Sequence, residues 1–318
     1  MNLDTETRNG YTILSSMKKV WSVQMELLGK LLDVCEKHQL RIWAEGGTLL
    51  GAVREHGYIP WDDDIDMAMM REDYDKLISI SQEEFQKPYY FQSGYSEENY
   101  PRGHAQLRKD NTAAINQYDI SQSFHQGIFI DIFVYDEIPD DEYDLQVFFN
   151  QIKKSYGKLK QYCEYKFSIF HPIISIKKYL DNLPIKKKGF HKAFEEFDNL
   201  LKSQEGNRIS CVGFSLDVNH YGRDKLWYSD TLLMPFEDIM MPVPSGYDMI
   251  LKTQYGDYMR PVKAPTNHGV FLVLDTAVSY EKYMPQLRKE AKQKRRNDRL
   301  KKIEKVLMGR KSHKCSLK

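Results

Sequence analysis

Apolar residues recur at helical spacing near the start of the chain. Between Tyr11 and Gln39 they fall three or four positions apart, which predicts an amphipathic helix with one face on the core. The residues of that face are Val20, Val23, Leu27, Leu28, Leu31, Leu32 and Val34. We therefore expect residues 1–40 to form an N-terminal helix that packs on a following domain.

Strand-like and helical patterns alternate along the rest of the chain. Gly127–Val134 is an apolar run of the length of a central strand, and residues 141–205 have a helical pattern. Other short strands are expected at 41–45, 89–93 and 103–116, and other helices at 49–55, 72–85 and 247–255. This mixture predicts an α+β fold with a helical insertion at about 140–210 and additional C-terminal helices.

An acidic segment, Trp61-Asp62-Asp63-Asp64-Ile65-Asp66-Met67, leads into apolar residues that end at Met70. On a strand, Asp62, Asp64 and Asp66 project to one face and Asp63 to the other, because side chains alternate. Aligned carboxylates resist burial unless a cation neutralises them, and their oxygens suit Mg²⁺ or Mn²⁺. A solvated acidic loop is the alternative. The apolar continuation favours the strand, with Asp64 and Asp66 as metal ligands.

Gly46 and Gly47 lie shortly before the acidic segment. Glycine lets backbone approach a phosphate closely, and Thr48 is the expected N-cap of the helix at 49–55. A glycine pair by itself more often makes only a turn. Together with the carboxylates, Gly46, Gly47 and Thr48 indicate a metal-dependent enzyme acting on a nucleotide or sugar diphosphate.

Asp131 is a single carboxylate inside the apolar run at 127–134. A buried charge without compensation costs several kcal/mol, so this group must be protonated, paired or bound to metal. If its strand lies beside the acidic strand, Asp131 supplies a third carboxylate to the same cation. A buried salt bridge is the competing interpretation.

Composition narrows the class of protein. The chain has 318 residues, of which 41% are hydrophobic, as in a folded globular protein. The first ten residues have no signal-peptide pattern, and no apolar run is long enough to span a membrane. Four scattered cysteines form no CxxC pair and suit a reducing compartment. A cytoplasmic protein is the expectation.

The C-terminal tail, residues 286–318, is strongly basic. It has 14 Lys or Arg against three acidic residues, so the remainder of the chain is acidic overall. The tail could bind an anionic surface at the inner membrane face or nucleic acid, or be a solvated helix. Nucleic acid is disfavoured because the tail lacks aromatic residues for base stacking. An apolar patch bracketed by lysines, SIFHPIISI, could contact a membrane, but we expect it to be a helix–helix core.

With these residues in place, the chain resembles the LicD family, which includes phosphocholine transferases and is related to fukutin-type ribitol-phosphate transferases. The matching segments are GGTLLGAVREHGYIPWDDDIDMAM, LRKDNT, FIDIFVYDEIP, LMPFEDIMMPVPSGYD and QYGDYMRP, in the family's order from about residue 40 to 262. The resemblance does not cover the basic tail or much of 140–210. It implies a nucleotidyltransferase-like catalytic domain at 41–285, with a mixed sheet flanked by helices.

The resemblance also implies roles for particular residues. Gly46 and Gly47 fit the family's turn, Asp64 and Asp66 its paired metal ligands, and Asp131 its later carboxylate. Arg54 and the Arg108-Lys109 pair occupy matching segments and could hold phosphate oxygens.

The implied reaction moves a substituted phosphate from a CDP-alcohol donor to a hydroxyl of a glycan or lipid-linked glycan, with CMP leaving. Phosphocholine is the favoured cargo, and Asp131 or Asp62 could accept the proton of the hydroxyl. Two alternatives stay open: a glycosyltransferase that binds a nucleotide sugar through Asp64-Ile65-Asp66, and a nucleotidyltransferase that releases pyrophosphate. A non-catalytic nucleic-acid-binding protein ranks last.

Overall fold

The computed structural model describes residues 1–168, 171–263 and 271–315. Within these residues the largest sheet has seven strands. Five follow the order β10-β9-β8-β4-β3, while β6 also pairs with β8, and β5 pairs with β6. Its strands are β3 (Trp43–Ala44), β4 (Asp66–Met70), β5 (Tyr89–Gln92), β6 (Ala105–Lys109), β8 (Phe129–Ile138), β9 (Arg208–Ser210) and β10 (Arg223–Asp224). Parallel and antiparallel pairs occur together, which confirms the predicted mixed sheet and α+β class.

Strand β8 is the long central strand of the sheet. Along one edge it pairs in parallel with β4, in a register that sets Asp131 opposite Asp66. Along the other edge its first half pairs with β6 and its second half with β9, both antiparallel. The predicted strand at 127–134 is therefore confirmed, and it has the acidic strand as its neighbour.

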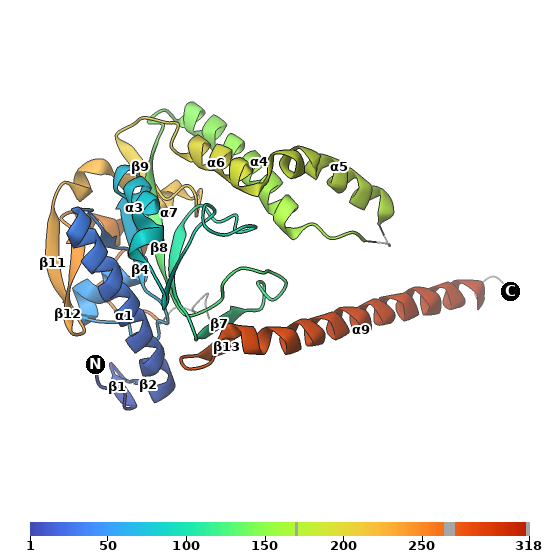
Figure 1. Cartoon of the computed structure of the whole chain (residues 1–318), viewed down its shortest axis with the longest axis horizontal. Coiled ribbons are helices and arrows are strands. Elements are labelled where there is room, and N and C mark those ends of the chain that lie inside the picture. Colours follow the sequence, from blue (N-terminus) through green and yellow to red (C-terminus); the bar gives the residue numbers. More distant parts are fainter. Residues whose placement is uncertain (169–170, 264–270, 316–318) are drawn as a thin grey trace.

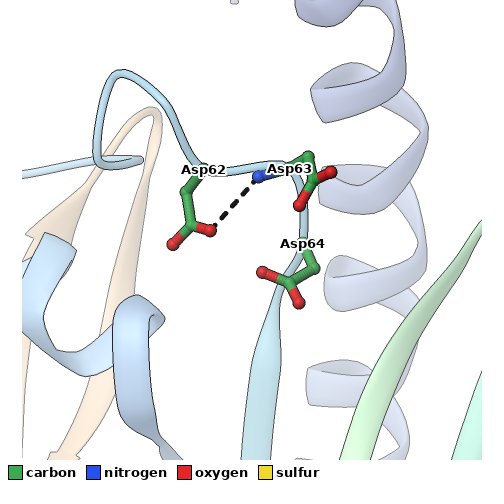
Figure 2. A group of neighbouring side chains, drawn as sticks. All are labelled: Asp62, Asp63 and Asp64. Carbon is green, nitrogen blue, oxygen red and sulfur yellow. Dashed lines mark hydrogen bonds between the residues drawn. The ribbon is translucent and has the colours of Figure 1, made fainter. Parts of the chain in front are cut away.

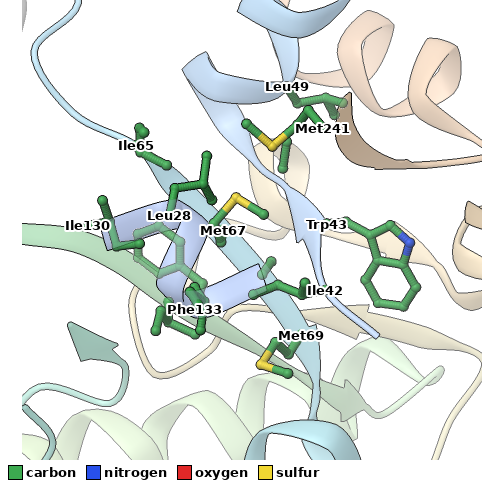
Figure 3. Packing of buried hydrophobic residues seen from close by; sticks show 14 of the residues in the cluster. Leu28, Ile42, Trp43, Leu49, Ile65, Met67, Met69, Ile130, Phe133 and Met241 are labelled. Carbon is green, nitrogen blue, oxygen red and sulfur yellow. The ribbon is translucent and has the colours of Figure 1, made fainter. Parts of the chain in front are cut away.

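Helices cover the sheet, and the core lies between them (Figure 1). The main helices are α1 (Ser15–His38), α3 (Arg71–Glu84), α4 (Glu142–Glu164), α5 (Pro172–Lys188), α6 (Phe190–Leu201), α8 (Tyr247–Tyr255) and α9 (Tyr280–Cys315). Shorter ones are α2 (Gly46–Leu50), a π-helical turn η1 (Gly51–Glu55), α7 (Val218–Tyr221) and a 3-10 turn η2 (Lys225–Tyr228). Figure 3 shows side chains of α1, β3, β4 and β8 packed together, including Leu28, Trp43, Met67 and Ile130.

The N-terminal helix starts later than its sequence pattern suggests. Residues Tyr11–Ile13 form strand β2, which pairs with β1 (Glu6–Arg8) across a turn at Asn9 and Gly10. The helix begins at Ser15, and its buried face packs into the core of the sheet. The prediction that the helix begins at Tyr11 was wrong because Tyr11–Ile13 pair with β1 as a strand.

Two further antiparallel pairs complete the body. Strands β11 (Thr231–Phe236) and β12 (Ile239–Pro244) form a hairpin whose second strand contacts β3. Strand β13 (Phe271–Asp275) pairs with β7 (Ala113–Asn116), and α9 follows β13. The predicted strand at 103–116 is therefore two strands, β6 and β7, which belong to different sheets.

The helices of the insertion, α4, α5 and α6, have a hydrophobic cluster of their own, with Phe148, Phe194 and Phe197 among its members. A buried ionic group joins this unit to the sheet. Arg71 donates to both carboxylate oxygens of Asp136 on β8, at 2.6 and 2.9 Å, and to Asp198 on α6 at 3.0 Å. Because Asp136 is fully buried, its charge depends on this guanidinium.

Two helical projections extend from the same side of the body (Figure 1). One consists of α4 and α5, and the other is α9, which contains the described part of the basic tail; residues 316–318 lie outside the described chain. The apolar segment at the start of α5 does not form a helix–helix core, contrary to our expectation, since Ile173, Ile174 and Ile176 are exposed. Among the described helices, none is both long and apolar enough to cross a bilayer.

Candidate active site

Three carboxylates meet where β4 and β8 begin. Oxygens of Asp64, Asp66 and Asp131 lie within 4.8 Å of one another, a separation at which one cation could contact all three. The parallel register of β4 and β8 produces this arrangement, because it sets Asp66 beside Asp131 and the amide of Asp131 donates to the Ile65 carbonyl. The expected approach of Asp131 to the acidic segment is confirmed. Its role as a metal ligand stays a prediction.

The acidic segment is not a strand along its whole length. Strand β4 starts only at Asp66, and residues 62–65 form an extended loop that two side chains of α1 hold from outside. Trp21 Nε1 donates to the carbonyl of Asp62 at 3.1 Å, and Gln24 Nε2 donates to that of Asp63 at 2.7 Å. The predicted strand over residues 62–65 was therefore wrong, although Asp64 and Asp66 do come together, as the alternation predicted.

The loop brings Asp63 close to its neighbours as well. Asp62, Asp63 and Asp64 form a second carboxylate group, and a side-chain oxygen of Asp62 accepts the amide of Asp63 at 3.3 Å (Figure 2). Strand alternation predicted that Asp63 points to a separate face, and this prediction was wrong. Asp64 belongs to both groups and is 8% exposed.

The glycine pair lies against these carboxylates. Gly46 has a left-handed φ of 54°, and a side chain there would come within 3.4 Å of an Asp66 oxygen. A Cβ on Gly47 would lie 2.5 Å from Asp62 Oδ2, closer than atoms can pack. Thr48 is not an N-cap: α2 begins at Gly46, and the Thr48 hydroxyl accepts the amide of Asp66 at 2.9 Å. These residues therefore fix the start of β4 against α2.

Strand β6 and the residue directly before it supply side chains that our sequence analysis missed. Gln106 lies opposite Asp131 and donates to its Oδ1 at 2.8 Å, and His104 Nε2 is 3.3 Å from the same oxygen. Burial raises the pKa of Asp131, but the bonds from His104 and Gln106 and the charge of Arg102 outweigh it, so the net pKa is lowered. Asp131 is thus held as an oriented carboxylate.

Arg108 lies two residues after Gln106 on β6, and its side chain lines the same cavity. Its guanidinium donates to Gln106 Oε1 at 2.6 Å, to the Gly127 carbonyl at 2.7 Å and to Gln92. Burial lowers its pKa to about 10, so it remains charged near neutral pH. Three of its five N–H groups are used in these bonds, which leaves donors for an anion.

Two other predicted phosphate contacts differ in position. Arg54 bonds Glu55 at 2.7 Å and the Tyr258 carbonyl at 2.8 Å and is not among the cavity residues, so the structure gives its assignment no support. Lys109 pairs with Glu26 on α1, also away from the cavity. Arg102, which we did not predict, lines the cavity and bonds Asp119 at 2.8 Å.

The cavity has a volume of about 500 Å³ and combines charged and aromatic walls. Its lining includes Gly46, Gly47, Asp66 and Asp131, together with Glu45, His104, Arg102, Arg108, Tyr156, Phe214, Tyr221, Tyr255 and Phe271. Glu45 was another omission, although it directly precedes the glycine pair. It is buried and accepts from Arg223 Nη2 at 3.2 Å. A ligand with a polyanionic part and a bulkier organic part matches these walls.

A mixed sheet, a glycine pair that begins α2 against the acidic segment, and a third carboxylate on the neighbouring strand are consistent with a nucleotidyltransferase-like fold. Comparison with known proteins specifies the family. Residues 39–183 match the family described as LicD/FKTN/FKRP, nucleotidyltransferase domain. Residues 39–183 therefore carry a LicD-type domain, and this match supports an enzyme of the transferase type. The match includes α4 and most of α5, which the sequence resemblance had left out.

Individual relatives agree with the family. The chain is 26% identical over 249 residues to the lipopolysaccharide cholinephosphotransferase LicD of Haemophilus influenzae, covering 75% of this chain and 89% of that protein. It is 46% identical over 43 residues to the human ribitol 5-phosphate transferase FKRP, covering 14% of this chain and 9% of that protein. An alignment with a Rickettsia prowazekii protein has 29% identity over 147 residues, or 46% of this chain and 51% of that one.

Proposed function

We propose that this protein transfers a substituted phosphate, phosphocholine first among the candidates, from a CDP-activated alcohol to a hydroxyl of a cell-surface glycan or its lipid-linked precursor. CMP is the leaving group. The observation that carries the proposal is the group of Asp64, Asp66 and Asp131, the last two of which line a 500 Å³ cavity, in a chain with a LicD-type domain. The cholinephosphotransferase and ribitol-phosphate transferase relatives support the type of cargo.

The donor set fits a hard divalent cation. Two carboxylates on adjacent strands and a third on the loop before β4 offer oxygen ligands. Mg²⁺ typically takes one or two carboxylates and completes its shell with phosphate and water. Asp64, Asp66 and Asp131 would hold the ion. When bound, Mg²⁺ or Mn²⁺ would neutralise the diphosphate and the charge that develops on the departing CMP.

The protein's own groups account for the remaining tasks. Gln106 and His104 hold Asp131 in one orientation, so the carboxylate cluster needs little rearrangement when a donor binds. Arg108, charged and with N–H donors to spare, is suited to phosphate oxygens. The proton of the attacking hydroxyl needs an acceptor, and Asp131 and His104 both line the cavity.

A ligand-binding panel tests the proposal. Thermal shifts with Mg²⁺ would compare CDP-choline, CDP-ribitol, CDP-glycerol, UDP-glucose and CTP on wild type and on Asp64→Asn/Asp66→Asn. A ligand at about 100 times its dissociation constant adds roughly 2.7 kcal/mol of stability. We expect one CDP-alcohol to stabilise wild type only with metal, and to leave the double variant unchanged. A response to UDP-glucose alone would indicate a glycosyltransferase, and pyrophosphate release from CTP a nucleotidyltransferase.

The basic tail is the second part of the proposal. Anionic lipid attracts nearby Lys and Arg by on the order of 1 kcal/mol each, so residues 286–318 would hold the enzyme near a lipid-linked acceptor. Deleting Gln286–Lys318 should reduce co-sedimentation with membranes and leave turnover of a water-soluble acceptor intact. Unchanged sedimentation of the truncated protein would remove the tail from this scheme.

A further inference from the structure

Helix α5 buries two polar side chains together with Ile185 and exposes its other isoleucines and its leucines. Ser175 and Asn182 are buried, at 4% and 6% exposure, on the side that contacts α4 and α6. Four apolar residues follow one another at intervals of three and four positions and so share one face. They are Ile173, Ile176, Leu180 and Leu183, which are 82%, 52%, 55% and 40% exposed. We call these four residues the α5 stripe.

The α5 stripe is bordered by positive charge. Lys177 lies beside it within the helix, and Lys186 and Lys187 lie in its last turn, whereas Lys188 pairs with Glu196 on α6. Tyr179, 42% exposed, adds an amphipathic ring at the edge of the stripe. An apolar face flanked by lysines and an aromatic residue is the composition of a helix that lies in the boundary of a bilayer.

The second projection, α9, adds to this basic surface. It extends from the body on the same side as α4 and α5 (Figure 1). Burial and the nearby charge of Arg295 on α9 lower the pKa of Lys166, just after α4, so positive charges on the two projections are close enough to interact. An anionic surface in contact with both would relieve that repulsion.

The cavity lies between the bases of the two projections. Tyr156 on α4 lines it from one side, and Phe271 on β13 and Asn116 on β7 line it from the other, directly before α9 begins. A flat partner that touches both projections would therefore face the cavity.

We propose that the α5 stripe docks on an anionic lipid bilayer. The four apolar side chains enter the boundary between headgroups and acyl chains, and the lysines beside them contact lipid phosphates. This surface adds an apolar component to the electrostatic membrane contact of the basic tail. A second copy of this chain fits the stripe less well, because it would bring lysines against lysines.

Vesicle binding tests the proposal with the full chain, without donor or metal, so its outcome is independent of the transfer reaction. Vesicles of phosphatidylcholine alone are compared with vesicles that also contain phosphatidylglycerol. The variant is Ile176→Glu/Leu180→Glu. The matched control is Leu226→Glu/Leu233→Glu, which makes the same change at two leucines that are 75% and 61% exposed elsewhere.

We expect wild type to bind the anionic vesicles, and the α5 variant to bind at least about tenfold more weakly with the basic tail still present, since each buried CH₂ contributes about 0.8 kcal/mol. The control should bind like wild type, and all three proteins should melt alike because the changed residues are exposed. Equal binding by wild type and the α5 variant would overturn the proposal, as would an absence of binding by wild type. A wild-type dimer that dissociates in the α5 variant would instead identify a second copy as the partner and would also overturn it.

Discussion

The charge state of the carboxylate cluster gives the sharpest test of the metal site, through the substitution Asp66→Asn. In the wild-type protein a carboxylate oxygen of Asp66 lies within 4.8 Å of oxygens of Asp64 and Asp131. At that separation two unit charges repel by about 1 kcal/mol in water and about 3.5 kcal/mol at the effective dielectric constant of a protein surface. Because Asp66 is half-buried, removing its charge should stabilise the metal-free protein by about 1–3 kcal/mol.

Metal should offset the stability advantage of the variant. Wild type with Mg²⁺ at about 100 times its dissociation constant gains roughly 2.7 kcal/mol, while Asp66→Asn loses a ligand and gains less. For a chain of this size the wild-type gain corresponds to a rise in melting temperature of about 4 °C. The variant should therefore melt higher than wild type with EDTA, and Mg²⁺ should raise the melting temperature of wild type more than that of the variant.

Asp63→Asn is the matched control for this experiment. Asp63 shares a carboxylate group with Asp62 and Asp64 but lies outside the group formed with Asp66 and Asp131. It should gain stability without metal and keep its response to Mg²⁺. If Asp63→Asn loses the response and Asp66→Asn keeps it, the ion belongs to the loop and our assignment is refuted. A cluster that does not respond to Mg²⁺ or Mn²⁺ in any variant would refute the metal site itself.

Three further results should follow from the structure. Gly47→Ala places a Cβ 2.5 Å from Asp62 Oδ2 and should cost about 1–3 kcal/mol and most activity, whereas Gly29→Ala on α1, with open space around it, should be neutral or stabilising in the same denaturant titration. Arg71→Met leaves the buried Asp136 without its guanidinium and should cost about 3–5 kcal/mol in urea unfolding; a loss below 1 kcal/mol would contradict the ionic link to the insertion. Burial lowers the pKa of His125 to about 4, and its Nδ1 accepts the Gly127 amide. The free energy of unfolding should therefore be highest above about pH 6.5 and fall by up to about 3 kcal/mol toward pH 4. His125→Gln should reduce this loss of stability at low pH, and an unchanged pH profile would exclude His125 as its cause.

Apolar patterning identified the parts of the site that regular strands carry. The run around Asp131 had the length of a central strand, and an unexplained carboxylate inside it indicated a partner, so the pairing with Asp66 could be expected. The loop at residues 62–65 could not be predicted from the sequence pattern. Its path depends on Trp21 and Gln24, which hold backbone carbonyls from a helix some forty residues away. Strand alternation fails there because tertiary hydrogen bonds, and not a neighbouring strand, fix the backbone.

The apolar stripe of α5 shows a different limit. From sequence, apolar residues at helical spacing normally indicate a face on the core, and that was our expectation for this segment. The structure buries Ser175 and Asn182 and exposes Ile173 and Ile176, the reverse of the usual pattern. A periodic pattern identifies a face but does not reveal what covers it.

The residues behind Asp131 did leave a signal in the sequence. His104, Gln106 and Arg108 alternate with Ala105 and Leu107, so a strand places the three polar side chains on one face and the two apolar ones on the other. In the structure all three line the cavity. Alternating polar residues on a strand usually indicate that one face of the strand is exposed to solvent. Here β6 lies beside the buried strand β8, where unpaired polar groups are costly. Three polar residues on one face of a strand next to a buried carboxylate are therefore evidence for a shared site, which Arg108 alone could not provide.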